Sequence, residues 1–271
     1  MIVTHPLTIA EIFDRATTLV VRRWVPTVSI AAVLALPRLL QAIVFPNAAA
    51  SSSAWFFAVL LMVVSLFVMP VFASAALALI FVGPDGTTLG EVLSRLLAAP
   101  WRFVRAALLY GFLGVVGILP LLGLISTMRG GTSTTVLVVV LLFFVWLVPA
   151  LVGVFELQLA FVGCAIEETG ATLSLMNACE RSLRPGLRWR TVLLAFGLTA
   201  AQTVPSFVLG WVIGVIAFTL GTPWVASLGV AVVEPLVWVV VIALTTVAAV
   251  DYRVRVEGSD LEAVLDATAP A

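Results

Sequence analysis

Residues 8–24 place apolar and polar side chains with the period of an α-helix. The apolar residues of this stretch share one face: Ile9, Ile12, Phe13, Ala16 and Val20. Polar residues recur at i, i+4, i+7 and i+11 on another face: Glu11, Arg15, Thr18 and Arg22. Thr8 stands three residues before Glu11, a spacing that predicts a capping box at the helix start. The pattern therefore predicts an amphipathic helix over residues 8–22.

The same polar pattern returns twice further along the chain. With an offset of eighty residues it is carried by Thr88, Glu91, Arg95 and Arg102, which include a second capping box. After a further eighty-six residues it is carried by Asn177, Arg181, Arg184 and Arg188. Asn177 stands where Glu91 stood, so the third copy lacks the capping glutamate. We expect two further surface helices, over residues 88–99 and 172–184.

Six long apolar stretches lie between and after these amphipathic segments. Each is long enough to cross a hydrocarbon core of about 30 Å, which requires about 20 helical residues. The stretches cover residues 24–45, 54–82, 103–127, 135–166, 191–220 and 224–250. The sequence thus predicts an all-α integral membrane protein with six transmembrane helices.

The chain is predicted to consist of three similar units, each with a surface helix and two membrane helices, and prolines recur at matching places in these units. Both membrane helices of every unit contain an internal proline: Pro37 and Pro70, Pro120 and Pro149, Pro205 and Pro235. Because each unit crosses the membrane twice, all units share one orientation. We predict parallel repeats over residues 7–86, 87–170 and 171–258 around an approximate threefold axis. The alternative is that every helix start on this side needs a cap and an anchor, which would recur without any repeat.

The predicted spans form one membrane domain over residues 1–250, and a polar tail follows over residues 251–271. Tyr252 and the arginines after it are expected to anchor the tail at the membrane surface as far as Glu257. Beyond that point the sequence has the signature of a short helix over residues 260–266.

Composition and charge indicate a protein that lies in a membrane. The side chains are 62% apolar and only 10% charged, which is too few charges to cover a protein of this size in water. The basic residues are all arginines, and twelve of the fourteen lie on one side of the predicted spans. We therefore expect both termini in the cytoplasm. The net charge of zero indicates no nucleic-acid partner.

Six arginines in or beside the predicted surface helices are expected to face lipid head groups, including anionic ones. They are Arg15, Arg22, Arg95, Arg102, Arg181 and Arg188. The alternative is that these arginines only orient the protein. Cys164 and Cys179 fall near the cytoplasmic side, where the compartment is reducing, so no disulfide is expected.

Three ionisable residues fall near the middle of predicted spans. At about 1.5 Å per residue, Arg38, Glu156 and Glu234 lie well inside a core of about 30 Å. An intramembrane charge is costly and usually pairs or faces a cavity. We predict that Arg38 pairs with Glu234, with Glu156 as the alternative or a third member. Nearby amides would join the cluster: Gln41, Gln158 and Gln202. The pair either fixes the helix register or takes part in transport.

No pattern in the sequence indicates an enzyme. The single histidine, His5, stands near the start of the chain, and neither cysteine has a companion at metal-ligand spacing. The glycines are scattered through spans and turns, so no phosphate-binding loop is predicted. We expect no catalytic residue, no metal and no cofactor.

Three polar segments carry a resemblance to a known family. They read TIAEIFDRATTLVVRRW, NACERSLRPGLRWR and AAVDYRVRVEGSDLE, and they resemble the bacterial glycerophosphoryl diester phosphodiesterase membrane domain family. In that family a tyrosine precedes the acidic residue of the last segment, whereas here Asp251 precedes Tyr252. The remaining positions fit the family: Arg253, Arg255, Glu257, Gly258 and Asp260. The resemblance covers nearly the whole chain, although only these segments are specific. It implies a module of the bacterial cytoplasmic membrane found beside or fused to soluble partners, here without the catalytic domain that gives the family its name.

Two classes of function fit these features. The first is a non-enzymatic accessory or scaffolding module that holds partner proteins, soluble or in the membrane, at its cytoplasmic face. The alternative is a transporter or lipid-handling protein that uses the intramembrane polar cluster. The family's associations motivate the first class, and the prolines and intramembrane charges motivate the second.

Overall fold

The computed structural model describes residues 6–48, 56–57, 59–60, 69–84, 87–128 and 133–268. Within these residues every regular element is a helix, which confirms the all-α class. The helices are α1 (Ile9–Arg22), α2 (Trp24–Ala48), α4 (Met69–Val82), α5 (Leu89–Ala98), α6 (Pro100–Met128), α7 (Ser133–Ile166), α8 (Ala171–Ser182), α9 (Arg188–Thr219) and α10 (Pro223–Thr268).

Several of these helices are long and apolar enough to span a membrane. Three candidate spans lie in α7, α9 and α10, at Val136–Ile166, Arg188–Thr219 and Gly229–Gly258. The number of candidate spans rises to five if two bent pairs of helices, α1 with α2 and α5 with α6, are each counted as one span. These features are typical of a protein embedded in a membrane. Part of the predicted second span lies outside the described residues, and six spans remain a prediction.

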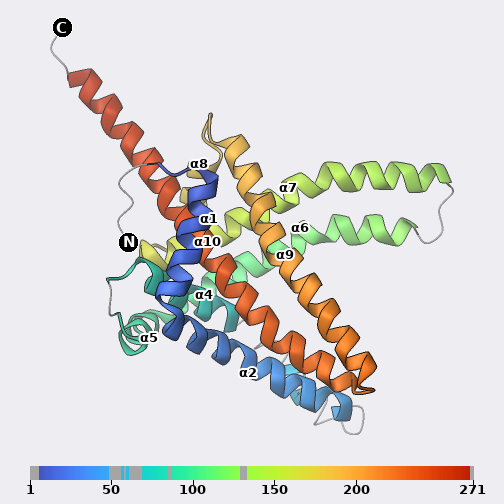
Figure 1. Ribbon diagram of the computed structural model, residues 1–271. Coiled ribbons are helices and arrows are strands. Elements are labelled where there is room, and N and C mark those ends of the chain that lie inside the picture. The colour runs from blue at the N-terminus through green and yellow to red at the C-terminus, as the bar shows by residue number, and fades with distance from the viewer. Residues whose placement is uncertain are drawn as a thin grey trace.

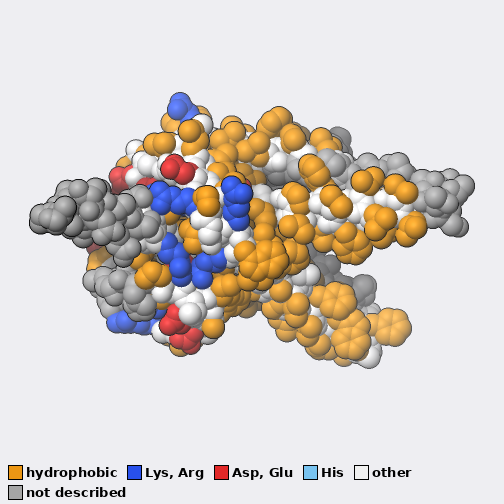
Figure 2. Space-filling model, turned by 90° about the horizontal axis from the view of Figure 1, so that it is seen from above, with side chains coloured by type: hydrophobic (Ala, Val, Ile, Leu, Met, Phe, Trp, Pro, Cys, Tyr) orange, Lys and Arg blue, Asp and Glu red, His pale blue; other side chains and the backbone are white. Residues whose placement is uncertain are grey.

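Helix α10 lies at the centre of the molecule. It packs against α9, α2, α1, α4 and α7, and its residues Val241, Ile242 and Val247 are fully or almost fully buried. In Figure 1, α2 and α9 run beside α10, whereas α6 and α7 form a second pair that points in another direction. In Figure 2 the arginines and acidic residues gather towards one end of the described part of this face, and hydrophobic side chains predominate over its other part. This face therefore has a charged end and an apolar body.

The two predicted capping boxes are present. In α1 the Glu11 amide donates to Thr8 Oγ1 at 3.2 Å, and the Thr8 amide donates to Glu11 Oε2 at 2.6 Å. Thr88 and Glu91 make the same pair of bonds in α5. Helix α8 follows Gly170 and has no side-chain cap, and Asn177, which stands where Glu91 stood, lies inside this helix rather than at its start. Local sequence signals therefore set the starts of α1 and α5.

Helix α10 does not end where the sequence predicts. The apolar stretch stops near residue 250, but the helix continues without a break to Thr268 and includes the segment predicted as a separate helix over residues 260–266. Arg253 Nε donates to Glu257 Oε1 at 2.6 Å, an i, i+4 ion pair that supports a helix in the polar part. Gly258 is not among the described glycines with a positive φ, so the helix passes through this position without a turn.

Candidate functional sites: the Asp251 network and the Glu234 groove

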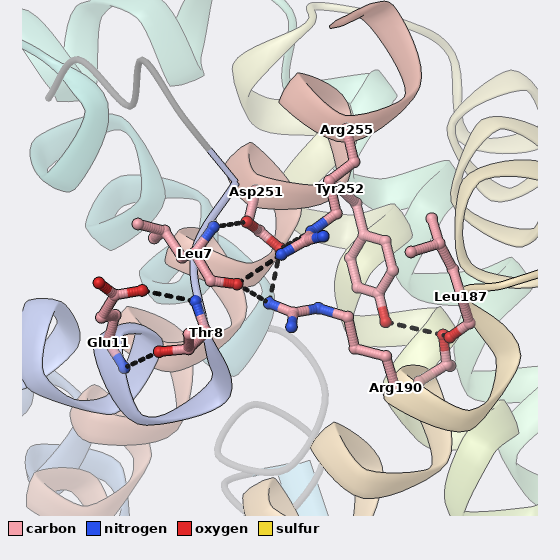
Figure 3. A network of polar contacts seen from close by, with 9 residues as sticks. Leu7, Thr8, Glu11, Leu187, Arg190, Asp251, Tyr252 and Arg255 are labelled. Atoms are coloured by element: carbon pink, nitrogen blue, oxygen red, sulfur yellow. Dashed lines mark hydrogen bonds and ion pairs between the residues drawn. The ribbon is translucent and has the colours of Figure 1, made fainter. Parts of the chain in front are cut away.

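A fully buried carboxylate joins three distant parts of the chain. Asp251 in α10 is 0% exposed, and its Oδ1 accepts a hydrogen bond from the Leu7 amide at 2.6 Å. Its Oδ2 accepts from Arg190 Nη2 at 2.8 Å and from Arg255 Nε at 3.0 Å (Figure 3). The carboxylate thus binds the segment before α1, the start of α9 and the next turn of α10. Two flanking arginines compensate its charge.

The backbone of Leu7 completes this arrangement. Its carbonyl accepts from Arg190 Nη2 at 2.6 Å and from Arg255 Nη2 at 2.5 Å (Figure 3). Leu7 immediately precedes the helix cap Thr8, and its side chain is fully buried, as is that of Ile12. A buried apolar pair at these positions is the arrangement of a hydrophobic staple, which fixes the angle at which a chain enters a helix. The same few residues therefore set both the polar and the apolar docking of α1.

Tyr252, the residue after Asp251, makes a second connection. Its hydroxyl lies 2.7 Å from Thr191 Oγ1 in α9, and Thr191 Oγ1 donates to the Ser182 carbonyl at the end of α8, also at 2.7 Å. Because Thr191 has only one proton to donate, the tyrosine supplies the proton of the first bond. We call the set Leu7, Arg190, Thr191, Asp251, Tyr252 and Arg255 the Asp251 network. It connects α1, α8, α9 and α10 at the charged end of the molecule.

Sequence reasoning found only part of this network. Asp251, Tyr252 and Arg255 were singled out through the family resemblance, whereas Leu7, Arg190 and Thr191 were not. One signal was available, because each of the three resembling segments contributes to the network or adjoins it. The first begins directly after Leu7, the second ends at Arg190, and the third contains Asp251. In the structure these three segments meet.

The predicted intramembrane cluster is only partly tested. The side chains of Arg38 and Gln41 lie outside the described residues, so their pairing remains a prediction. Glu156 faces α8, where Ser182 Oγ donates to it at 2.9 Å and Cys179 Sγ lies at 3.5 Å. The prediction that Glu156 lies near mid-depth and is an alternative partner of Arg38 remains a prediction. In the structure α8 packs against α7 and supplies both of these contacts.

Two members of the predicted cluster do lie around one cavity. Gln202 of α9 and Glu234 of α10 line a groove of about 430 Å³ together with Thr203 and Ser206. Phe207, Gly210, Val230 and Val233 form the remaining lining. We call this cavity the Glu234 groove. Pro205 and Pro235 lie within the two helices beside it, and each removes one helix hydrogen bond there. Gln158 is elsewhere, 3.5 Å from Thr245 Oγ1.

The six predicted surface arginines differ in their environments. Arg22, Arg95 and Arg188 are exposed, whereas Arg15, Arg102 and Arg181 are partly buried. Arg181 forms an ion pair with Glu167 at the end of α7, so lipid is not its only partner. The guanidinium of Arg102 lies 4.9 Å from the centre of the Phe103 ring. Only Arg22, Arg95 and Arg188 are therefore as exposed as a head-group contact requires.

The described residues include no group of three or more His, Cys, Asp or Glu residues that could hold a metal ion. Cys164 and Cys179 are free thiols. Burial raises the pKa of Cys179 from 9.0 to about 11, and the charge of Glu156 adds to this effect, so its thiol is a poor nucleophile at neutral pH.

Fold and sites together define a helical, membrane-embedded protein with a polar network at its charged end and a polar groove between two apolar helices. The chain matches no protein-family model, no curated protein and no solved structure.

Proposed function

We propose that the protein is a non-enzymatic multi-pass module of the bacterial cytoplasmic membrane that holds a partner protein at its cytoplasmic face. One observation carries this proposal. Helix α10 continues past the buried Asp251 to Thr268, and in Figure 1 its last turns extend beyond the other helices. We call residues 253–268 the α10 arm. The Asp251 network fixes its base, so the arm leaves the membrane body in a defined direction.

A helix that extends beyond the other helices is expected to need a partner. At about 1.5 Å per residue the arm extends about 26 Å beyond Asp251. Even a helix of the arm's 16 residues is only weakly stable alone in water, because most helix stability in proteins comes from packing an apolar face. In the sequence of the arm, Leu261, Val264 and Leu265 follow at i, i+3 and i+4, the spacing of such a face. A partner that covers these residues would stabilise the arm.

The arrangement of the surface helices supports the predicted threefold repeat. Helix α1 packs on α10, α5 packs on α4, and α8 packs on α7. In every case a surface helix contacts the last helix of another repeat, in cyclic order. Helices α1 and α5 bend by 87° and 77° relative to the helices that follow them. Such angles suit helices that lie in the membrane plane beside helices that cross it.

The orientation and the family remain parts of the proposal. The gathering of arginines at one end supports the assignment of that end, and with it both termini, to the cytoplasm. The meeting of the three resembling segments in one network supports kinship with the membrane domain family named above. Members of that family occur beside or fused to soluble partners, which agrees with a module that presents an arm.

The test is copurification of the tagged chain from mild detergent, with quantitative mass spectrometry. We expect a stoichiometric partner that is lost from the double variant Leu261→Asp/Leu265→Asp and retained by Glu257→Gln, a control at the exposed side of the arm. Two aspartates would place charge on the apolar face without removing the Asp251 network. The proposal fails if the wild-type chain has no stoichiometric partner, or if the double variant retains it.

The Glu234 groove favours a second candidate function, the handling of lipid. Polar side chains from two candidate spans surround a cavity of about 430 Å³, and polar groups at such depth usually mark a pathway or a binding site. The purified chain in vesicles would then move lipids with labelled head groups between leaflets faster than protein-free vesicles do. Ser206→Leu should slow this movement, and Leu108→Phe on exposed α6 should not. Movement equal to that in protein-free vesicles would exclude this candidate.

A further inference from the structure

An apolar cavity lies beneath α5, apart from both sites described above. It has a volume of about 270 Å³, is lined by α2, α4 and α5, and is partly open to the outside. Its lining includes Ile30, Leu34, Ala73, Ala76, Leu93 and Leu96. Ser29 is the single polar member of this lining, and its Oγ donates to the Val25 carbonyl at 2.9 Å. The walls therefore offer hydrocarbon and no unbonded hydroxyl. We call this space the α5 cavity.

Comparison with α1 explains why the space is open. Phe13 of α1 reaches over Gly197 of α9, where an added Cβ would lie 3.1 Å from the ring. In the repeated pattern Leu93 stands eighty residues after Phe13, so a shorter side chain takes the place of the ring. Leu93 and Leu97 remain 52% and 69% exposed, although α5 buries Val92 and Leu96. An aromatic side chain thus fills the space under α1, and the equivalent space under α5 is left open as the cavity.

We propose that the acyl chain of a bilayer phospholipid occupies the α5 cavity. Protein interiors are close-packed, and an apolar cavity of about 150 Å³ stays dry and accepts a hydrocarbon ligand. The α5 cavity is larger, and it adjoins Val33, an exposed residue of a candidate span whose outer side would contact lipid. Arg95 on the exposed side of α5 supplies a cation for the lipid phosphate. This inference does not depend on any partner of the α10 arm.

Ordinary lipid contact would not reach the same residues. Ile30, Leu34 and Leu96 line the cavity but are buried from the molecular surface. A lipid that only covers the outside of the protein can touch Leu93 or Leu97 but not these three. Contact between lipid and the buried lining residues therefore distinguishes an acyl chain bound in the cavity from a lipid that only surrounds the protein.

The test uses the full chain in nanodiscs that contain a phospholipid with a photoreactive group in its acyl chain. We expect crosslinks to Leu96, mapped by mass spectrometry, and none to Leu77, which is buried on α4 but does not line the cavity. Ala76→Phe should fill the cavity and abolish the crosslink to Leu96. Leu108→Phe, on exposed α6, should leave it unchanged.

Two outcomes would overturn the proposal. The first is a crosslink yield at Leu96 no higher than that at Leu77 in the wild-type chain, a result that needs no variant to fold. The second is labelling of Leu96 by a photoreactive free fatty acid but not by the phospholipid, which would assign the cavity to a different ligand. If Ala76→Phe is poorly folded, Ala73→Leu on the same wall provides the filling variant, and persistence of the crosslink in that variant would also count against the proposal.

Discussion

Removal of the Asp251 carboxylate is expected to destabilise the protein strongly. In Asp251→Ala the Leu7 amide loses its acceptor, and Arg190 and Arg255 are left without the charge between them. Asp251→Asn keeps the shape of the side chain but turns an amide donor towards guanidinium donors. Both variants should therefore loosen the contact of α1 with α9 and α10 while leaving the apolar core in place.

The burial of the Asp251 network sets the size of the expected loss in stability. Breaking one partner of a buried ion pair costs about 3 to 5 kcal/mol, because the remaining charges stay buried and uncompensated. Asp251 is 0% exposed and Arg190 is 15% exposed, so this range applies more closely than the small value for surface pairs. A loss of 1 kcal/mol lowers the melting temperature by about 2 to 4 °C in a chain near this size. We expect Asp251→Ala to lower it by about 6 to 20 °C.

The buried thiol of Cys164 provides the assay. A dye that fluoresces on reaction with thiols reports its exposure as the detergent-purified protein is heated. Glu257→Gln is the matched control, because it breaks an exposed i, i+4 pair of the same helix, worth about 0.3 to 0.5 kcal/mol. If Asp251→Ala and Glu257→Gln melt at the same temperature, the network does not hold the helices together and the reasoning is refuted.

Four further outcomes are expected. Because burial and Glu156 raise the pKa of Cys179 to about 11, the stability that this thiol contributes is present below pH 9 and is lost as pH rises through about 11. Glu156→Gln should accelerate alkylation of Cys179 in mildly alkaline buffer, and an unchanged rate would remove Glu156 as a cause. Gly197→Val should push against Phe13 and cost about 1 to 3 kcal/mol, of which Phe13→Ala should recover a part; additive losses would show that the two residues do not meet. Arg95→Gln should lower affinity for anionic lipid about fivefold, for a contact worth about 1 kcal/mol, and equal lipid retention in native mass spectrometry would contradict this.

Features encoded over one or two helix turns could be predicted from the sequence. The capping boxes at Thr8 and Thr88 depend on residues three positions apart, and both are present. Such signals depend on local backbone geometry, which does not change with the tertiary environment.

Features that depend on distant packing could not be predicted in the same way. Nothing in the sequence near Arg190 shows that its partner is Asp251, sixty-one residues away. An ion pair between distant residues produces no periodic pattern in the sequence. The contacts of Glu156 with Ser182 and Cys179 likewise depend on the packing of α8 against α7, which no local pattern shows. The end of α10 was missed because the change from apolar to polar residues at 250 was read as a helix end. A helix can instead leave a membrane without interruption, since its backbone bonds are internal.

The bond between Leu7 and Asp251 gives the protein an order of assembly. The two residues are 244 positions apart, so at about 5 to 20 residues per second the ribosome completes Asp251 about 12 to 50 s after Leu7. During that interval α1 has been made, but its carboxylate partner has not. Helix α1 is therefore fixed by this bond long after its own synthesis, and a nascent chain that stops before residue 251 cannot form the bond.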